Sequence, residues 1–292
     1  MKAAAFAYAR AKSVDDALQL LAAHGDMAKV LSGGQSLMPA MNLRLISPEI
    51  IVDIGAIAAL RGIAVKGDVL CIGALTRHVD LLRSPDIGTH APLLAEAAAH
   101  VAHPAIRNRG TLGGSLAHAD PAAELPACML ALDAVIVLRS RSGERRIAAV
   151  DFFQGIFQTA LSAEELLIAV ELPIARKNVT HFFHEFARRH GDYAIAGVAA
   201  QAVVDGGAFA DLRLAFFAVG DRPVLAEAAS ALVKAAITTT QVSKACAALG
   251  EELDPQDDQQ ASGEMRRHLA KVLLARAVAA LLGRPELAGR VA

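Results

Sequence analysis

Two short glycine-containing stretches, Ser32-Gly33-Gly34-Gln35-Ser36 and Thr111-Leu112-Gly113-Gly114-Ser115, decide how this chain is interpreted. Adjacent glycines allow positive φ angles and a close approach of the backbone to a ligand, so successive N–H groups can converge on phosphate oxygens. Each stretch precedes a run that favours helix, and helix N-termini attract anions. A single Gly-Gly pair is more often a simple tight turn. Two pairs, both flanked by hydroxyl residues, favour a clamp for the pyrophosphate of a dinucleotide.

The usual nucleotide-binding signatures are absent, because the sequence contains no GxGxxG and no GxxxxGK[ST] motif. A dinucleotide would therefore bind without a Rossmann fold or a P-loop. We expect backbone amides of the two loops to hold opposite sides of the pyrophosphate, with hydroxyls of Ser36, Thr111 and Ser115 adding direct bonds. Since neither loop contains a cation, the sequence predicts binding through oriented dipoles.

The first loop belongs to a short αβ lobe predicted over residues 1–57. Ser13 and Asp16 form a capping signal before an apolar helix, and Gly25 is placed to end it. Apolar runs at 28–31 and 49–53 predict strands on either side of the loop. The order of strand, loop, helix and strand indicates a compact unit.

Two further units are expected, over residues 58–175 and 176–292. The first has predicted strands at 63–65, 69–72, 134–138, 146–149 and 166–172, a helix at 93–100 and a hairpin turn at 141–144. The second has predicted strands at 181–188, 197–204 and 208–218, then helices at 225–234, 240–249 and 263–282. We therefore predict an α+β fold of two αβ subdomains followed by a three-stranded antiparallel sheet with a helical bundle.

Composition excludes several classes of function. The 292 residues carry a formal net charge of −1, with no basic run, so no nucleic acid partner is expected. No stretch approaches the roughly 20 apolar residues of a membrane span, and no secretory signal begins the chain. We expect a cytoplasmic protein without a transmembrane segment. Basic residues of the last helix leave a peripheral position at the inner membrane open, although a solvated or partner-docking face is the preferred interpretation.

Neither a metal site nor a catalytic residue set is predicted. Cys71, Cys128 and Cys246 are far apart in sequence, and an iron–sulfur cluster needs four ligands, so such a cluster would lie on another polypeptide. The pair His100/His103 has no third ligand nearby, and the pair His181/His184 lies in a predicted strand with Phe182 and Phe183 between. No set of residues has the pattern of a nucleophilic triad.

In these motifs the chain resembles the FAD-binding medium subunit of the molybdenum hydroxylases, the family that includes carbon monoxide dehydrogenase and the flavin region of xanthine dehydrogenase. The resemblance rests on SGGQS at 32–36 and TLGG at 111–114, which match the family's AGGxS and T(I/L)GG loops, and on SLAHADPAAEL at 115–125. It extends over almost the whole chain. It implies a PCMH-type FAD-binding fold and FAD as the cofactor of this chain.

The resemblance also implies which residues contact FAD. The strand before the first loop would follow the adenine side of the dinucleotide, and Glu124 would replace the family's ribose-binding acid. Leu161 and Leu167 would contact the adenine or flavin region, and Tyr193 would cover or gate the isoalloxazine ring. The whole predicted set is Lys29, Val30, Leu31, Ser32, Gly33, Gly34, Gln35, Ser36, Leu37, Val101, Ala102, Thr111, Leu112, Gly113, Gly114, Ser115, Glu124, Leu161, Leu167, Asp192 and Tyr193.

Three positions depart from the family pattern. Gln35 stands where many members have His, Ser32 replaces Ala, and Ala187 falls where relatives often have Lys. Charge close to the ring changes both the flavin potential and the choice of acceptor. The departures therefore leave those two properties open.

The implied function is electron transfer within a heterotrimer, itself expected to form a dimer of heterotrimers. Substrate would be oxidised at molybdopterin in a large subunit, and electrons would pass through two-iron two-sulfur clusters of a small subunit to FAD here. A quinone, NAD or another acceptor would receive them. Two alternatives remain open: a self-sufficient FAD-dependent oxidase or reductase with its own substrate, and a non-catalytic assembly module. The substrate of the complex is not indicated.

Overall fold

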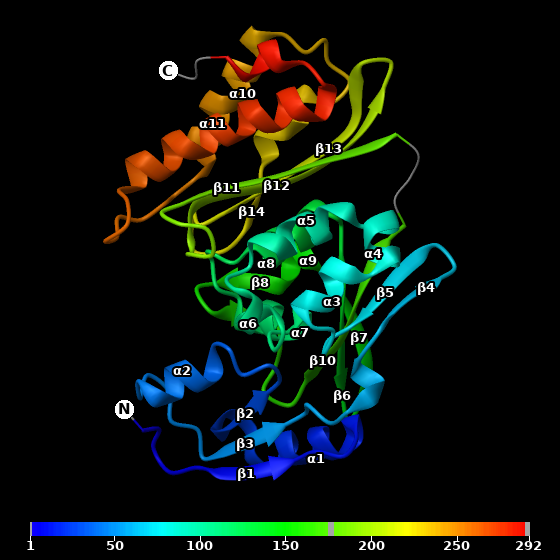
Figure 1. Cartoon of the computed structure of the whole chain (residues 1–292), viewed down its shortest axis with the longest axis vertical. Helices are drawn as coiled ribbons and strands as arrows, with labels where there is room; N and C mark the ends of the chain where they lie inside the picture. The colour runs from blue at the N-terminus through cyan, green and yellow to red at the C-terminus, as the bar shows by residue number, and fades with distance from the viewer. Residues whose placement is uncertain (1, 175–177, 290–292) are drawn as a thin grey trace.

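The first loop follows β2 of a parallel three-stranded sheet with strand order β1-β3-β2. This computed structural model describes residues 2–174 and 178–289. The sheet consists of β1 (Ala7–Arg10), β2 (Ala28–Leu31) and β3 (Ile50–Asp53). It packs against α1 (Val14–His24), which begins where the Ser13 hydroxyl accepts a hydrogen bond from the Asp16 amide at 3.1 Å. The short helix α2 (Leu37–Asn42) comes directly after the loop (Figure 1).

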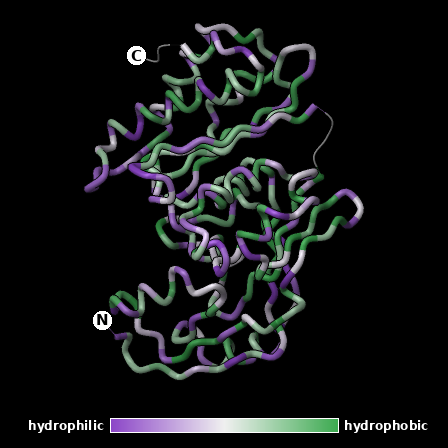
Figure 2. The backbone as a smooth tube through the Cα atoms, in the orientation of Figure 1, coloured by the Kyte–Doolittle hydropathy of each residue, from purple (hydrophilic) through white to green (hydrophobic). Residues whose placement is uncertain are grey.

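The middle unit is built on an antiparallel sheet of order β4-β5-β10-β6-β7. Its strands are β4 (Ile63–Lys66), β5 (Val69–Gly73), β6 (Val135–Ser140), β7 (Gly143–Ala148) and β10 (Leu166–Pro173), with the small hairpin β8 (Phe153–Gly155) and β9 (Gln158–Thr159) beside it. Its helices are α3 (His78–Arg83), α4 (Pro85–His90), α5 (Pro92–His100), α6 (Pro104–Arg107), α7 (Leu112–His118), α8 (Glu124–Ala131) and α9 (Ala149–Phe152). The hydrophilic turn between β4 and β5 projects from this unit (Figure 2).

The C-terminal unit is a second antiparallel sheet covered on both faces. Its strands are β11 (Val179–Ala187), β12 (Ala194–Asp205), β13 (Ala208–Phe217) and β14 (Val224–Leu225). The helices α10 (Thr239–Glu252) and α11 (Gly263–Leu282) lie on the outer face, and α5 and α8 of the middle unit lie on the inner face (Figure 1). Phe216 and Phe217 are both fully buried, in separate hydrophobic clusters on the two faces. Two-sided burial explains the nearly continuous apolar sequence of β12 and of the last residues of β13.

Two predictions for this unit were wrong in detail. The helix predicted at 225–234 is instead β14 followed by the 3₁₀ segment η3 (Glu227–Leu232), so the sheet has a fourth strand. The amides at the start of η3 donate to the Glu252 carboxylate, which lies on α10. The sequence gives no periodic pattern for these elements, because β14 has only two residues and the carboxylate that binds the start of η3 is 25 residues away. The remaining 3₁₀ segments are η1 (Gly25–Met27), η2 (Ala58–Leu60) and η4 (Pro285–Ala288).

The other predicted elements are present within a few residues. The helix predicted at 263–282 matches α11, with Ser262 accepting from the Met265 amide and Gly283 ending it at φ 64°. The predicted hairpin turn at 141–144 joins β6 and β7. The expected boundary between residues 175 and 176 lies outside the described residues.

Candidate functional site

A cavity of about 720 Å³ lies between the first and middle units. The first loop and the end of β2 form one wall, and the segment leading to Thr111 forms the other. Its lining residues are Arg10, Leu31, Ser32, Gly33, Gly34, Gln35, Met38, Pro39, Asn42, Asp53, Gly55, Arg61, Leu75, Arg77, Ile106, Asn108, Arg109 and Thr111.

The first loop presents unused backbone donors to this cavity. Gly34 has φ +75°, a conformation that a side chain would strain, and the Gln35 side-chain amide donates to the Gly33 carbonyl at 2.9 Å. Within the described residues, the backbone N–H groups of Gly33, Gly34, Gln35 and Ser36 donate no hydrogen bond to the protein. Clustered amides without protein acceptors form an anion-binding concavity. The predicted role of this loop is therefore compatible with its geometry.

The second loop is arranged differently from the prediction. Instead of preceding a helix, it forms the first turn of α7, with the Thr111 hydroxyl accepting from the Gly114 amide at 3.1 Å. The Gly113 amide donates to the Ala74 carbonyl at 2.9 Å, and the Ser115 amide donates to the Thr111 carbonyl at 3.0 Å. These three amides are therefore bonded within the chain, unlike the amides of the first loop, so the two loops are not arranged symmetrically.

Close packing explains the glycines of the second loop. A Cβ atom on Gly113 would lie 2.6 Å from the Ala74 Cβ, and one on Gly114 would lie 2.8 Å from the Thr111 hydroxyl. These glycines let α7 approach the end of β5 and keep its N-cap. The sequence predicts ligand contact for Gly113 and Gly114, and the structure shows that both glycines also serve tertiary packing.

The two loops touch each other directly. The hydroxyls of Ser32 and Thr111 are 2.7 Å apart. A Cβ atom on Gly33 would lie 2.3 Å from the Arg109 carbonyl oxygen, so only glycine fits at this crossing. The loops therefore form one continuous floor for the cavity, contributed by two units.

Four arginines that the motif analysis did not include also line the cavity. Arg10, Arg61, Arg77 and Arg109 come from four separate segments, and Asp53 is the single acidic residue in the lining. Asp53 accepts from the Tyr8 hydroxyl at 2.5 Å and from the Gly55 amide at 2.7 Å. The two loops themselves contain no cation, whereas the cavity that they border is lined by these four arginines. No local sequence signal brings these arginines together, because each arrives from a different element.

A second group of predicted residues gathers near the start of β12, apart from the loops. Gly191, at φ +87°, packs against the Ala102 carbonyl and the ring of His103, which brings the 188–193 segment onto the end of α5. The Arg107 side chain donates to the carbonyls of Val101 and Ala102 at 2.8 and 2.9 Å. The structure thus holds Val101, Ala102, Asp192 and Tyr193 in one region.

The carboxylates of Asp120 and Glu124 affect the ionisation of side chains in this second group. Burial raises the pKa of Glu124 to about 7, and nearby Glu185 and Asp120 add to the effect. The pKa of the Tyr193 hydroxyl is raised by partial burial and by the charges of Asp120 and Glu124, although 58% of the whole residue remains exposed. Tyr193 therefore combines an accessible ring with a hydroxyl directed toward carboxylates.

The remaining predicted residues do not line the cavity. Leu167 is 4% exposed in the core of the middle unit, and Leu161 packs against the same core. Lys29 and Val30 lie on β2, with Val30 packed against the core of the first unit. Among the predicted residues, those that line the cavity are Leu31, Ser32, Gly33, Gly34, Gln35 and Thr111.

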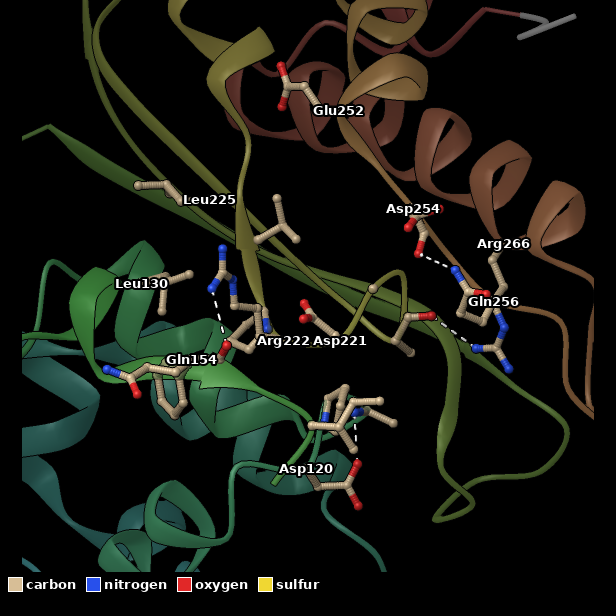
Figure 3. Close-up of a pocket in the computed structure, with 18 of the residues that line it drawn as sticks. Asp120, Leu130, Gln154, Asp221, Arg222, Leu225, Glu252, Asp254, Gln256 and Arg266 are labelled. Carbon is tan, nitrogen blue, oxygen red and sulfur yellow. Dashed lines mark hydrogen bonds between the residues drawn. The ribbon is translucent and has the colours of Figure 1, made fainter. Parts of the chain in front are cut away.

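A larger cavity of about 1050 Å³ lies between the middle and C-terminal units (Figure 3). Several acidic residues line it, but many are used in folding. Asp258 pairs with Arg266 at 2.6 Å, and Glu252 accepts from the amides at the start of η3. Asp120 accepts from the Ala122 amide at 2.9 Å. These carboxylates therefore stabilise the fold around the cavity. Their contacts do not indicate a catalytic set among the described residues.

Comparison with known proteins gives two family matches that together extend over most of the chain. Residues 4–175 match the FAD binding domain in molybdopterin dehydrogenase, and residues 181–281 match the CO dehydrogenase flavoprotein C-terminal domain. The 6-hydroxypseudooxynicotine dehydrogenase complex subunit alpha of Paenarthrobacter nicotinovorans is 40% identical over 97% of this chain and 97% of its own length.

Solved structures agree with these matches. A chain of carbon monoxide dehydrogenase from Hydrogenophaga pseudoflava, in a form that lacks the Mo-pyranopterin moiety of the molybdenum cofactor, superposes with a TM-score of 0.95 at 36% identity, covering 97% of this chain and 99% of that chain. Quinoline 2-oxidoreductase from Pseudomonas putida 86 gives a TM-score of 0.90 at 38% identity, covering 97% and 99%. Among the described residues, no helix combines the length and apolar character needed to cross a membrane.

Proposed function

This chain belongs to the family of FAD-binding medium subunits of molybdenum hydroxylases, and we propose that its cavity between the first two units holds the pyrophosphate of FAD. As a family member it is the FAD-binding electron-transfer subunit of an oxidoreductase. When bound, FAD accepts and passes on electrons, while the protein binds, orients and tunes it.

One observation carries the placement of the pyrophosphate. Four consecutive backbone amides, from Gly33 to Ser36, lack acceptors among the described residues, and Gly33, Gly34 and Gln35 line a cavity that four arginines also line. A pyrophosphate supplies oxygens for such amides and negative charge for the guanidinium groups. We assign the first loop to direct amide contact. In the second loop, Thr111 and Ser115 would contribute hydroxyls, because their neighbours' amides are used in the fold.

The other predicted contacts are part of the same proposal. The dinucleotide would extend along Lys29, Val30, Leu31 and Leu37 at one end. At the other end it would reach Val101, Ala102, Asp192 and Tyr193, where the exposed Tyr193 ring would lie against the flavin. Glu124 would bind the ribose. Leu112, Gly113 and Gly114 would shape the floor, and Leu161 and Leu167 would support it from the core. We also propose that residues 1–57, 58–175 and 176–292 act as the N-terminal FAD-binding, middle FAD-binding and C-terminal domains.

Relatives of this chain are named as single subunits of larger enzymes: a subunit alpha in one case and a medium subunit or medium chain in others. We propose the same assembly for this chain: a large molybdopterin subunit, a small subunit with two-iron two-sulfur clusters, and a dimer of such heterotrimers. In the structure Cys71, Cys128 and Cys246 are free cysteines on β5, α8 and α10. Electrons would reach FAD from the small subunit and leave to a quinone, NAD or another acceptor. A cytoplasmic complex, free or attached at the inner membrane, completes the proposal.

The test is native purification of the full chain with whatever copurifies. An absorption spectrum, acid release of the flavin and mass analysis of the partners would be measured on the same sample. We expect one FAD per chain, with one iron–sulfur and one molybdopterin-bearing partner. FAD on a solitary chain that oxidises an organic substrate would favour a self-sufficient oxidase. A folded sample without flavin would overturn FAD binding and support a non-catalytic assembly module.

A further inference from the structure

The hairpin formed by β8 and β9 presents an exposed apolar surface, and its residues do not line the pyrophosphate cavity. Ile156 and Phe157 at its turn are 57% and 56% exposed, and Val150 of the preceding helix α9 is 46% exposed. Val150 and Ile156 line the same cavity between the middle and C-terminal units. Large apolar residues that are exposed together mark a surface that another molecule covers. We call Val150, Ile156 and Phe157 the apolar patch.

The backbone of Phe157 has a conformation that its side chain disfavours. Its φ angle is +55°, in the left-handed region where glycine and asparagine are far more common than a bulky aromatic residue. Its amide donates to the Ala119 carbonyl at 3.2 Å, and its ring packs on the His118 ring with 4.8 Å between the centroids. These contacts leave more than half of Phe157 exposed. Neither backbone preference nor burial explains an aromatic residue here, and such an outlier points to a function.

The base of the hairpin is fixed against the C-terminal unit. Arg222 donates from Nη1 to the Gln154 carbonyl at 3.4 Å, and a Cβ atom on Gly155 would lie 3.7 Å from Oδ2 of Asp221. Figure 3 shows Arg222 and Asp221 on the segment that faces Gln154. These contacts hold the apolar patch at a defined place on the surface.

Helix α7 connects the apolar patch to the pyrophosphate cavity. It begins at the cap residue Thr111, which lines that cavity, and ends at His118, whose ring contacts Phe157. Its seven residues span about 10 Å at the rise of an α-helix. A protein bound to the apolar patch would therefore lie one short helix away from the proposed position of FAD. That position suits a partner that exchanges electrons with the cofactor.

The cavity beside the apolar patch has a strongly negative lining. Eight acidic residues and two arginines line it, a formal balance of −6 in a chain whose whole charge is −1. Both arginines are engaged, Arg266 with Asp258 and Arg222 with the hairpin. A positively charged group from outside the chain would therefore be favoured here. The acidic lining residues are Asp120, Asp151, Asp221, Glu227, Glu252, Asp254, Asp257 and Asp258.

Several of these carboxylates are available to such a group. Those of Asp151, Asp221 and Glu227 have no hydrogen bond or ion pair among the described residues, and all three residues are exposed. Exposed carboxylates beside exposed apolar side chains match a peptide segment that has both basic and apolar side chains. A small cation would leave the ring of Phe157 uncovered.

We propose that the apolar patch and the acidic cavity together dock a basic segment of a partner subunit. Apolar side chains of that segment cover Ile156 and Phe157. Its Lys or Arg side chains enter the cavity opposite Asp151, Asp221 and Glu227. The inference rests on the proposed function, which places this chain in a multi-subunit complex. Docking at this surface fixes the partner beside the cofactor site, and the charge complementarity selects the correct partner.

Carboxyl labelling of the natively purified complex tests whether the partner covers this surface. Carbodiimide and glycine ethyl ester modify accessible carboxylates, and mass analysis gives the extent of labelling at each residue. We expect Asp151, Asp221 and Glu227 to be labelled several-fold less in the complex than in the isolated full chain. Asp205 and Asp211 are the comparison, because both are exposed and neither lines the cavity.

Two labelling results would contradict the proposal. Equal labelling of the three cavity carboxylates in the complex and in the isolated chain would show that no partner covers them. Protection that develops in the isolated chain as its concentration rises would assign the surface to a second copy of this chain.

The variant Phe157→Asn separates docking from folding. Asparagine favours the left-handed conformation at φ +55°, so the turn should keep its stability, whereas the ring that the partner covers is lost. The variant and the wild-type chain are coexpressed with limiting partner subunits. We expect Phe157→Asn to be at least about tenfold under-represented in the purified complex. Val65→Asn is the matched control, since Val65 of β4 is 42% exposed outside the apolar patch, and it should assemble in proportion to its expression.

Flavin content of the free chains separates the two kinds of failure. Equal FAD in the wild type and Phe157→Asn shows that reduced assembly reflects docking. Equal incorporation of these two chains would overturn the docking surface and leave FAD binding and assembly standing. A wild-type chain that copurifies with no partner would overturn the proposed assembly itself, and this surface with it. If Phe157→Asn does not fold, the exposed double variant Asp221→Asn/Glu227→Gln decides by the same competition, with under-representation again expected.

Discussion

The hydroxyl oxygens of Ser32 and Thr111 lie 2.7 Å apart, although 79 residues separate them in the chain. Ser32 follows β2 of the first unit, and Thr111 caps α7 of the middle unit. One hydrogen bond therefore joins the two units at the floor of the cavity.

Removing the two hydroxyls separately should have unequal effects. Ser32→Ala loses the bridge alone, and we expect unfolding free energy to fall by about 0.5–1 kcal/mol. Thr111→Val also removes the acceptor for the Gly114 amide, so about 1–2 kcal/mol is expected. Denaturant unfolding of both single variants and the double variant checks this. The double variant should resemble Thr111→Val, since the bridge is already lost there, and simple additivity would argue against the bridge.

Gly33→Ala should separate the two loops. The added Cβ would meet the Arg109 carbonyl at 2.3 Å, so backbone must move on one side of the cavity. We expect FAD affinity, measured by flavin fluorescence titration, to fall at least about tenfold, equal to ~1.4 kcal/mol. Gly88→Ala is the control, because nothing lies within 4 Å of its added Cβ. Unchanged FAD affinity in Gly33→Ala would show that the crossing of the loops does not shape the site.

FAD binding should weaken as salt concentration rises, because four arginines line the cavity. Salt screens charge pairs much more than it weakens hydrogen bonds from neutral amides. We expect Kd to increase severalfold between low and high ionic strength, and Arg109→Gln to reduce that dependence. Arg83→Gln, an equal charge change on the exposed side of α3, serves for comparison. A flat salt profile in the wild type would favour the dipole-only interpretation of the loops.

His78 should make the chain sensitive to mild acid. Its side chain lies beneath Gly110, the residue is 5% exposed, and burial lowers its pKa to about 4. Because the unfolded chain binds this proton near pH 6.5, stability should fall as pH decreases from 6.5 toward 4, by about 3 kcal/mol. Above pH 6.5 the group contributes no pH dependence.

The variant His78→Leu tests this assignment. It removes two buried ring nitrogens that have no hydrogen-bond partners among the described residues. We expect higher stability than the wild type at pH 5 and a flatter profile between pH 4 and 6.5, measured by denaturant unfolding across that range. An acid profile identical to that of the wild type would assign the sensitivity to other groups.

Much of the fold could be predicted because its signals are local. Strand β2 and helix α11 have the bounds that apolar runs and caps predict, as at Ser262 and Gly283. Strand β1 was missed because it is largely exposed and obtains its order from pairing with β3, more than 40 residues away. The short strand β14 was missed for a similar reason, since its pairing with β13 is its main determinant.

The candidate site likewise has one part that the sequence predicts and another that it does not. The glycine loops could be found from sequence because adjacent glycines are a local pattern. The arginines of the cavity could not, because Arg10, Arg61, Arg77 and Arg109 belong to separate segments that only the tertiary structure brings together. The bonding of the second loop's amides was equally hidden, because their acceptors include the Ala74 carbonyl at the end of β5.

The contact between the loops also imposes an order of events during synthesis. The first loop leaves the ribosome 79 residues before Thr111 follows it. At roughly 5–20 residues per second, that interval lasts on the order of ten seconds. During it, the nascent chain carries four bare amide donors in a half-built cavity. The cavity proposed for FAD is therefore complete only after the first two units have docked, late in the synthesis of the chain.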